Sequence, residues 1–209
     1  MTSRSGHARK ITNNAKRLQL MLFVEGHKTE PGYFFHWYRL YRERVIVNIA
    51  SLPNVTTPIE LVERAIKQRA ADTKEAKRGK GDTFDEYWCV FDVDDHPHLD
   101  EALALADTDG INVALSNPCI ELWFIIHFKS RTAYIERGEA EDEAKEILKC
   151  GKTLSPEALK RLVQAYDKAK SNALALDKKH EGDGSPPQSN PSSGVWRLVD
   201  TIQGVATAS

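Results

Sequence analysis

The chain has 209 residues, of which 41% are hydrophobic, and a formal net charge of -1. This is enough chain for one domain with a sizeable core. The near-zero charge argues against a general, charge-driven nucleic-acid binder. No apolar run approaches the roughly 20 residues needed to cross a membrane, and the first 17 residues contain no apolar stretch typical of a secretory signal. Its three cysteines form no C-x-x-C pair. Free thiols in a reducing compartment are therefore expected, and with them a cytoplasmic location without membrane contact.

Hydrophobic periodicity and helix-start residues predict an alternation of strands and helices. Thr29 is expected to cap the first helix, Thr57 the second, and Ser155 a long helix near the C-terminus. The expected elements, in chain order, are strand 18–25, helix 30–41, strand 44–51, helix 58–79, strand 86–92, helix 99–106, strand 111–116, helix 118–128, helix 138–149, helix 155–180 and helix 195–203.

This order predicts an α/β fold with a mostly parallel sheet, right-handed crossovers and flanking helices. We expect a basic leader over residues 1–17 and an α/β domain over 18–130. Residues 131–209 are expected to form a helical C-terminal extension, with a Gly/Ser/Pro-rich loop at 182–194.

Carboxylates follow two of the apolar strands at the point where each strand ends. Glu25 closes the first, and Asp92 and Asp94 close the strand that begins at Glu86. Residues two apart in an extended chain point to the same side, so Asp92 and Asp94 can converge. Ligands of open α/β sheets bind outside the carboxyl ends of the strands, and carboxylate oxygens suit Mg²⁺ or Mn²⁺. A solvated turn is the alternative interpretation of the aspartate pair.

Two basic stretches are candidates for contact with nucleic-acid phosphates, although solvated surface is the alternative for both. The residues that we expect to bind are Arg9, Lys10, Lys16, Arg17, Lys77, Arg78 and Lys80. A different sequence, Cys150-Gly151-Lys152-Thr153, is similar to the end of a phosphate-binding loop. It lacks the first glycine of that motif, where Glu146 stands, so we expect no nucleotide-hydrolysing loop.

Four segments together resemble the RloB family: VEGHKTEPGYF (24–34), WCVFDVDDH (88–96), LSNPCIELWFIIHF (115–128) and NPSSGVWRLV (190–199). The glutamate-glycine and Asp-x-Asp pair also resemble the Toprim module of topoisomerases, primases and some nucleases. The resemblance implies a Toprim-like fold and a role in anti-phage defence, including abortive infection, beside an ATPase partner.

By the module's pattern, Glu25 corresponds to a general acid/base, and Asp92 and Asp94 correspond to metal-binding aspartates. Glu30 stands where that pattern often has an aspartate, either as a helix-start residue, which we favour, or as a supporting carboxylate. Glu121 is a candidate for an additional metal ligand, with a structural salt bridge as the alternative.

The expected function is a Mg²⁺-dependent nuclease that hydrolyses phosphodiesters of DNA or RNA, with tRNA as a target by analogy. Mn²⁺ could replace Mg²⁺. Glu25 would move the proton, and Lys28 could neutralise a nonbridging oxygen. One alternative is a non-catalytic Toprim subunit that binds or senses. Another is a small-molecule phosphatase, which is disfavoured because the threonine expected after the aspartates is missing. The sequence does not define the oligomeric state.

Overall fold

The computed structural model describes residues 16–52, 57–81, 83–93 and 98–205. These residues form, in chain order, β1 (Leu18–Val24), α1 (Thr29–Tyr41), β2 (Val45–Ser51), α2 (Pro58–Lys77), β3 (Glu86–Asp92), α3 (Leu99–Thr108), β4 (Asn112–Asn117), α4 (Ile120–Ile126), α5 (Arg137–Leu148), α6 (Pro156–Gln164), α7 (Tyr166–Asp183), β5 (Ser192–Ser193) and α8 (Val195–Gln203). None of the helices in these ranges is long and apolar enough to cross a membrane.

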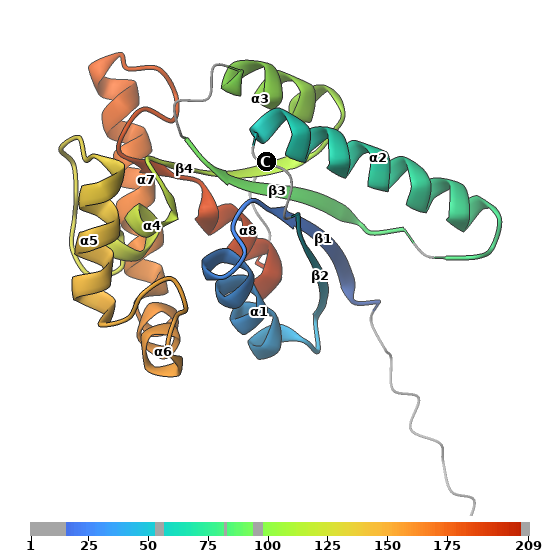
Figure 1. Ribbon diagram of the computed structural model, residues 1–209, viewed down its shortest axis with the longest axis horizontal. Helices are drawn as coiled ribbons and strands as arrows, with labels where there is room; N and C mark the ends of the chain where they lie inside the picture. Colours follow the sequence, from blue (N-terminus) through green and yellow to red (C-terminus); the bar gives the residue numbers. More distant parts are fainter. Residues whose placement is uncertain (1–15, 53–56, 82, 94–97, 206–209) are drawn as a thin grey trace, which may run out of the picture.

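The strands form one sheet in the order β2-β1-β3-β4-β5 (Figure 1). The pairs β1–β2, β1–β3 and β3–β4 are parallel, and only the short β5 runs antiparallel, to β4. Parallel neighbours require crossover connections, which α1, α2 and α3 supply. The expected α/β fold with a mostly parallel sheet, flanking helices and a helical C-terminal region is therefore confirmed.

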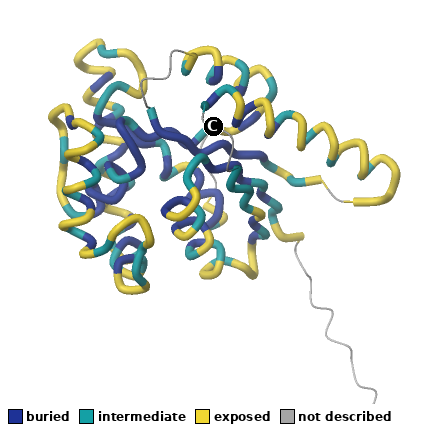
Figure 2. The backbone as a smooth tube through the Cα atoms, in the orientation of Figure 1, coloured by how far each residue is buried: buried dark blue, intermediate teal, exposed yellow. Residues whose placement is uncertain are grey.

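The two faces of the sheet are covered by different helices, and the sheet lies buried between them (Figure 2). Because side chains alternate along a strand, Leu20, Leu22 and Val24 of β1 enter one apolar cluster. Phe23 enters the other cluster, which also receives residues of α2 and α3. The first cluster is larger and contains side chains of α1, α4, α8 and the C-terminal helices. Trp88 and Val90 of β3 point into it, so Asp92, two residues further on, starts from the same face.

The C-terminal region returns to the sheet. The antiparallel β5 pairs with the end of β4, and α8 contacts α1, β2 and β4. Leu198 of α8 is completely buried. Residues on both sides of position 130 thus share one core, while the proposed division at that position stays a prediction.

Two local expectations are wrong. Thr29 does not cap α1: Lys28 is the N-cap residue, and the Thr29 hydroxyl donates instead to the carbonyl oxygen of Lys152, 2.8 Å away. The single helix expected from Ser155 to about His180 is two helices, separated at Ala165. The helical sequence pattern of residues 155–180 is continuous. The break at Ala165 is followed directly by Tyr166, whose hydroxyl donates to Asp200 in α8 at 2.7 Å. Tertiary contacts therefore override local propensity here.

The other two expected caps are confirmed. The Thr57 side chain accepts from the amide of Glu60, and Ser155 accepts from the amide of Ala158. Both helices also begin with proline, whose missing N–H costs nothing at that position.

Candidate active site

Glu25 and Asp92 lie at the same edge of the sheet because their strands are direct neighbours. In the parallel pair β1–β3, Val24 is opposite Val90. The amide of Glu25 extends this pairing by donating to the carbonyl oxygen of Val90 at 3.2 Å. Both carboxylates therefore follow the carboxyl ends of adjacent parallel strands, the usual position of a ligand site in this class of fold.

Glu30 joins them from the first turn of α1, where a negative charge is favoured by the helix dipole. Its side chain also folds back over Gly26: a Cβ placed on this glycine would lie 2.0 Å from Glu30 Oε2. Glycine is thus needed here for close approach. Glu30 is only 8% exposed. It therefore has both of the roles considered for it, that of a helix-start residue and that of a carboxylate within the site.

Glu121 is the fourth carboxylate of the cluster, in the first turn of α4, directly after β4. Burial is the main cause of a raised pKa at Glu30, and the charges of Glu121 and Glu25 raise it further. Burial also raises the pKa of Asp92 well above its usual value, with contributions from Glu30, Glu121 and Glu25. The four groups named here, which we call the carboxylate cluster, therefore repel one another across a shared space.

A guanidinium from the C-terminal extension enters the carboxylate cluster. Arg137, the first residue of α5, places Nη2 3.2 Å from Asp92 Oδ2. Its Nε lies 3.4 Å from Glu141, one turn further along the same helix. The charge of Arg137 lowers the pKa of Asp92 and so partly offsets the effects of burial and the neighbouring carboxylates.

A cavity of about 510 Å³ is lined by Glu30, Asp92, Glu121, Arg137 and Glu141. Lys28 and Lys152 line it too, and both are exposed. The bond from Thr29 to the carbonyl of Lys152 ties the 149–155 loop to the start of α1. The lysine of the CGKT sequence therefore reaches the site. The sequence had indicated neither Arg137 nor Lys152, since both arrive through the fold of the C-terminal extension.

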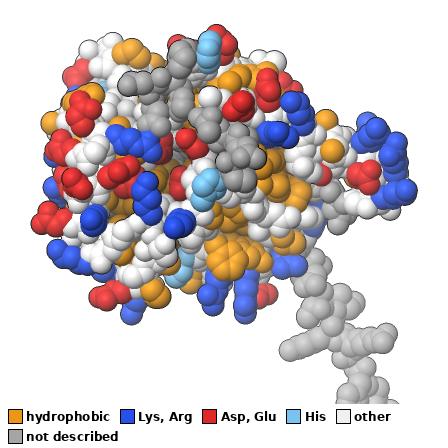
Figure 3. All heavy atoms as spheres, in the orientation of Figure 1, with side chains coloured by type: hydrophobic (Ala, Val, Ile, Leu, Met, Phe, Trp, Pro, Cys, Tyr) orange, Lys and Arg blue, Asp and Glu red, His pale blue; other side chains and the backbone are white. Residues whose placement is uncertain are grey.

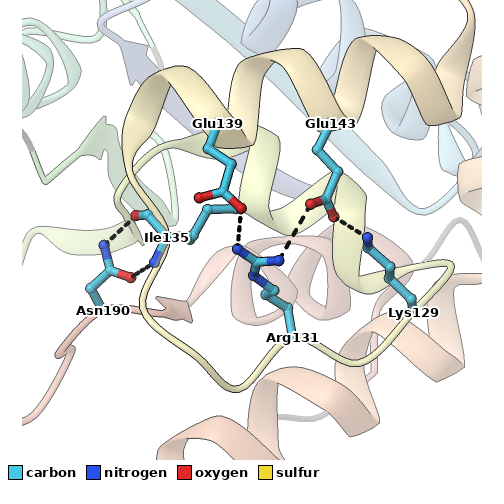
Figure 4. A network of polar contacts seen from close by, with 6 residues as sticks. All are labelled: Lys129, Arg131, Ile135, Glu139, Glu143 and Asn190. Carbon is cyan, nitrogen blue, oxygen red and sulfur yellow. Dashed lines mark hydrogen bonds and ion pairs between the residues drawn. The ribbon is translucent and has the colours of Figure 1, made fainter.

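Polar contacts fix the segment that leads into α5 (Figure 4). The amide side chain of Asn190 pairs with both backbone groups of Ile135, accepting from its N–H at 3.0 Å and donating to its carbonyl at 2.9 Å. Arg131 lies between two glutamates of α5, 2.5 Å from Glu139 and 3.6 Å from Glu143. These contacts hold the start of α5, and with it the backbone of its first residue, against the rest of the fold.

The predicted phosphate-binding residues do not gather at this site. Lys16 and Arg17 precede β1. Lys77 ends α2, and Arg78 and Lys80 follow it before β3, so all five are at the amino ends of the strands. A strand of seven residues spans about 20 Å, which separates them from the carboxylate cluster. Figure 3 shows Lys and Arg side chains gathered at the end of α2. Arg9, Lys10 and Asp94 lie outside the described residues.

The oxygen donors of the carboxylate cluster suit a hard divalent cation such as Mg²⁺. As the side chains stand, no three His, Cys, Asp or Glu residues in the described ranges are arranged to hold a metal ion. The guanidinium of Arg137 is the cation beside Asp92. The donor chemistry therefore fits the expected metal, with Asp92, Glu25 and Glu121 as the residues that would hold it, but the side chains must rearrange to do so.

His127 belongs to the core rather than to the site. It lies in the 115–128 segment, directly after α4. It is 1% exposed, and its Nδ1 lies 2.7 Å from the carbonyl oxygen of Trp123. Burial lowers the pKa of His127 to about 4. The ring is therefore neutral at neutral pH and donates to that carbonyl.

The family model described as RloB-like protein matches residues 20–202, which is most of the chain. No curated protein matches significantly. The matched range includes the carboxylate cluster, Arg137, Lys152 and the Asn190 contacts.

Proposed function

The chain belongs to the RloB-like family, and from this premise we propose that it is a Mg²⁺-dependent nuclease of the Toprim type. In this proposal it hydrolyses phosphodiesters of DNA or RNA, with tRNA as one target by analogy. It acts in the cytoplasm as the effector of an anti-phage defence system, and an ATPase partner controls it.

The observation that carries this proposal is the meeting of Glu25 and Asp92 at the ends of adjacent parallel strands, with Glu30 and Glu121 beside them. The four side chains come from β3, from the segment that follows β1, and from the first turns of α1 and α4. Two of these carboxylates, Glu30 and Asp92, are buried, and burial together with the neighbouring negative charges raises the pKa of both. Such an arrangement destabilises the fold unless a cation or proton offsets it. Such a costly arrangement is typical of a functional site.

The residues divide the chemistry among them. Asp92 and Glu121 would supply oxygen ligands, and Glu25 would accept the proton of the attacking water. Lys28 would neutralise a nonbridging phosphate oxygen from the rim of the cavity. Bound Mg²⁺ would stabilise charge on the phosphoryl oxygens and lower the pKa of a water ligand.

A second candidate function is a non-catalytic subunit that binds or senses through the same site. One observation favours it: Asp92 is paired with Arg137, as a carboxylate that binds no metal would be. A nucleic acid or nucleotide could then bind in the cavity through Lys28 and Lys152 without being cleaved.

A reconstituted cleavage assay separates the two candidates. The chain is purified together with its ATPase partner and incubated with labelled RNA and DNA in Mg²⁺ or EDTA. We expect cleavage of one nucleic-acid class in Mg²⁺ only, and at least about a hundredfold loss of rate for Glu25→Gln and Asp92→Asn, the usual scale for removing a general base or a metal ligand.

Matched controls make the same chemical changes on the surface. Glu43→Gln and Asp107→Asn alter exposed residues away from the site and should cleave like the wild type. Binding of nucleic acid with no cleavage under any of these conditions, equal for the wild type and Asp92→Asn, would instead support the binding subunit.

A further inference from the structure

Helix stability explains the position of Arg137 only in part, through the pair that its Nε makes with Glu141 one turn along α5. Arg137 is the first residue of α5, where the helix dipole disfavours a positive charge and favours an acid. The helix is rich in glutamates, yet the base stands at this end. Its side chain leaves the helix to reach Asp92 of β3, 45 positions away in the sequence. The placement therefore serves the site as well as the helix.

The Arg137–Asp92 pair joins a half-exposed side chain to a nearly buried one. The Asp92 side chain is 10% exposed, whereas that of Arg137 is 41% exposed. The backbone at Arg137 is held by the contacts of Arg131 and Asn190 just before it. The guanidinium can thus turn about its side-chain bonds toward the cavity while its anchor stays in place.

Asp92 cannot serve both cations fully. Arg137 Nη2 uses Oδ2, one of the two oxygens that a divalent cation would need. A divalent ion carries twice the charge of a guanidinium, so in a cluster of four carboxylates it gains more Coulomb energy than the arginine does. A guanidinium released from Asp92 remains in the same cavity, within reach of whatever anion binds there.

Phosphodiesters are anions for which arginine is well suited. The planar guanidinium donates two parallel hydrogen bonds to two oxygens of a phosphate, which lysine cannot do. Lys28 and Lys152 line the same cavity of about 510 Å³, so the released Arg137 would complete a set of three cations around the substrate. The carboxylates and the cations would then bind metal and phosphate respectively.

We infer that Arg137 binds a nonbridging oxygen of the substrate phosphodiester, and that its ion pair with Asp92 is the substrate-free arrangement, which a divalent cation displaces. This inference rests on the proposed nuclease function. It assigns the phosphate-binding residue to the C-terminal extension, outside the α/β portion that carries the carboxylates.

Metal binding without substrate tests whether a divalent cation displaces Arg137 from Asp92. Mn²⁺ is titrated calorimetrically into the full-length chain as wild type, Arg137→Gln, Arg137→Lys and Asp92→Asn, with the exposed Arg39→Gln of α1 as the matched control. We expect Arg137→Gln to bind Mn²⁺ about three- to tenfold tighter, since a competitor is removed. Arg137→Lys and Arg39→Gln should stay near the wild type, and Asp92→Asn should lose binding.

Substrate binding without cleavage tests whether Arg137 contacts the phosphodiester. A labelled oligonucleotide of the cleaved class is titrated in Ca²⁺ with the ATPase partner present. We expect Arg137→Gln to weaken binding about tenfold or more. Arg137→Lys should restore only part of the loss, because lysine keeps the charge but cannot donate two parallel hydrogen bonds to a phosphate. Circular dichroism and thermal melting confirm that each variant is folded.

The outcomes separate the inference from the proposed function. Equal or weaker Mn²⁺ binding by Arg137→Gln, with Asp92→Asn abolishing it, overturns the displacement while leaving the metal site in place. Tighter metal binding with unchanged oligonucleotide affinity overturns the phosphate contact. Absence of Mn²⁺ binding in every protein overturns the inference together with the metal-dependent nuclease.

Discussion

Replacing Gly26 by alanine tests the close approach between the turn after β1 and the side chain of Glu30. The new Cβ would lie 2.0 Å from Glu30 Oε2, far below ordinary van der Waals contact. The clash involves the end of a flexible side chain, so we expect Glu30 to swing away rather than the backbone to move. The variant should therefore fold with a displaced carboxylate.

The magnitude follows from what Glu30 loses. Burial and the charges of Glu121 and Glu25 raise the pKa of Glu30, whereas its hydrogen bonds with the backbone of Glu30 and Gly26 lower it and so stabilise the charged form. Losing charge-assisted bonds costs about 1.5–3 kcal/mol. Alanine restricts the unfolded chain and returns about 0.4–1 kcal/mol. We therefore expect Gly26→Ala to lower the free energy of unfolding by about 1–2 kcal/mol.

A double-mutant cycle with Glu30→Ala isolates the contact. Urea unfolding at neutral pH is measured for the wild type, both single variants and the double variant. If the steric contact is the cause, Gly26→Ala should cost almost nothing once Glu30 is alanine, giving a coupling energy of about 1–2 kcal/mol. An equal cost in both backgrounds would show that the backbone at Gly26, rather than the Glu30 side chain, carries the effect, and would refute this account.

The remaining predictions concern the supports of the site. The pKa of His127, about 4 in the folded chain, lies below the usual value of 6.5. The unfolded chain therefore binds more protons between these pH values, and stability is lost as pH falls from about 6.5 to 4, by about 3 kcal/mol. His127→Asn should flatten that part of the curve of unfolding free energy against pH, whereas an unchanged slope would show that other groups cause it. Asn190→Ala removes both contacts to Ile135 and should cost about 1–3 kcal/mol. Hydrogen exchange at the Ile135 amide should become faster in Asn190→Ala but stay slow in Asn190→Asp, which keeps the acceptor; equal exchange in both would contradict the assigned bond.

Much of the fold could be predicted because its strands carry clear local patterns. The apolar runs that end in Glu25 and Asp92 identify both the strands and the edge at which the carboxylates meet. The alternation of elements then allows few arrangements other than a parallel sheet. Glu121 was a candidate for the same reason, since it follows the fourth strand in a short, apolar helix.

The features that the sequence did not predict depend on how the C-terminal extension packs against the sheet and the site. β5 has two residues inside a Gly/Ser/Pro-rich segment, too short for any periodicity. Arg137 stands in an acidic helix, where a solvated surface was the natural interpretation, and Lys152 stands in an incomplete phosphate-loop motif. Their position at the site depends on α5 and the 149–155 loop packing beside α1 and α4, which no local pattern encodes.

The basic stretches show the opposite case, in which residues predicted from the sequence do not lie at the site. Charge alone indicated Lys77, Arg78 and Lys80 as phosphate contacts, but the fold places them at the amino ends of the strands. Their expected role in nucleic-acid binding stays a prediction, and it would require a ligand long enough to reach around the molecule.

Whether the carboxylate cluster is responsible for cleavage of nucleic acid is tested most directly in infected cells. The chain is expressed with its ATPase partner as wild type, Glu25→Gln and Asp92→Asn, and the integrity of total RNA and plasmid DNA is followed after phage challenge. We predict that the wild type degrades one nucleic-acid class and protects the culture, while both variants accumulate as folded protein and do neither. Protection that survives both substitutions would show that the carboxylates are not catalytic and would contradict the account.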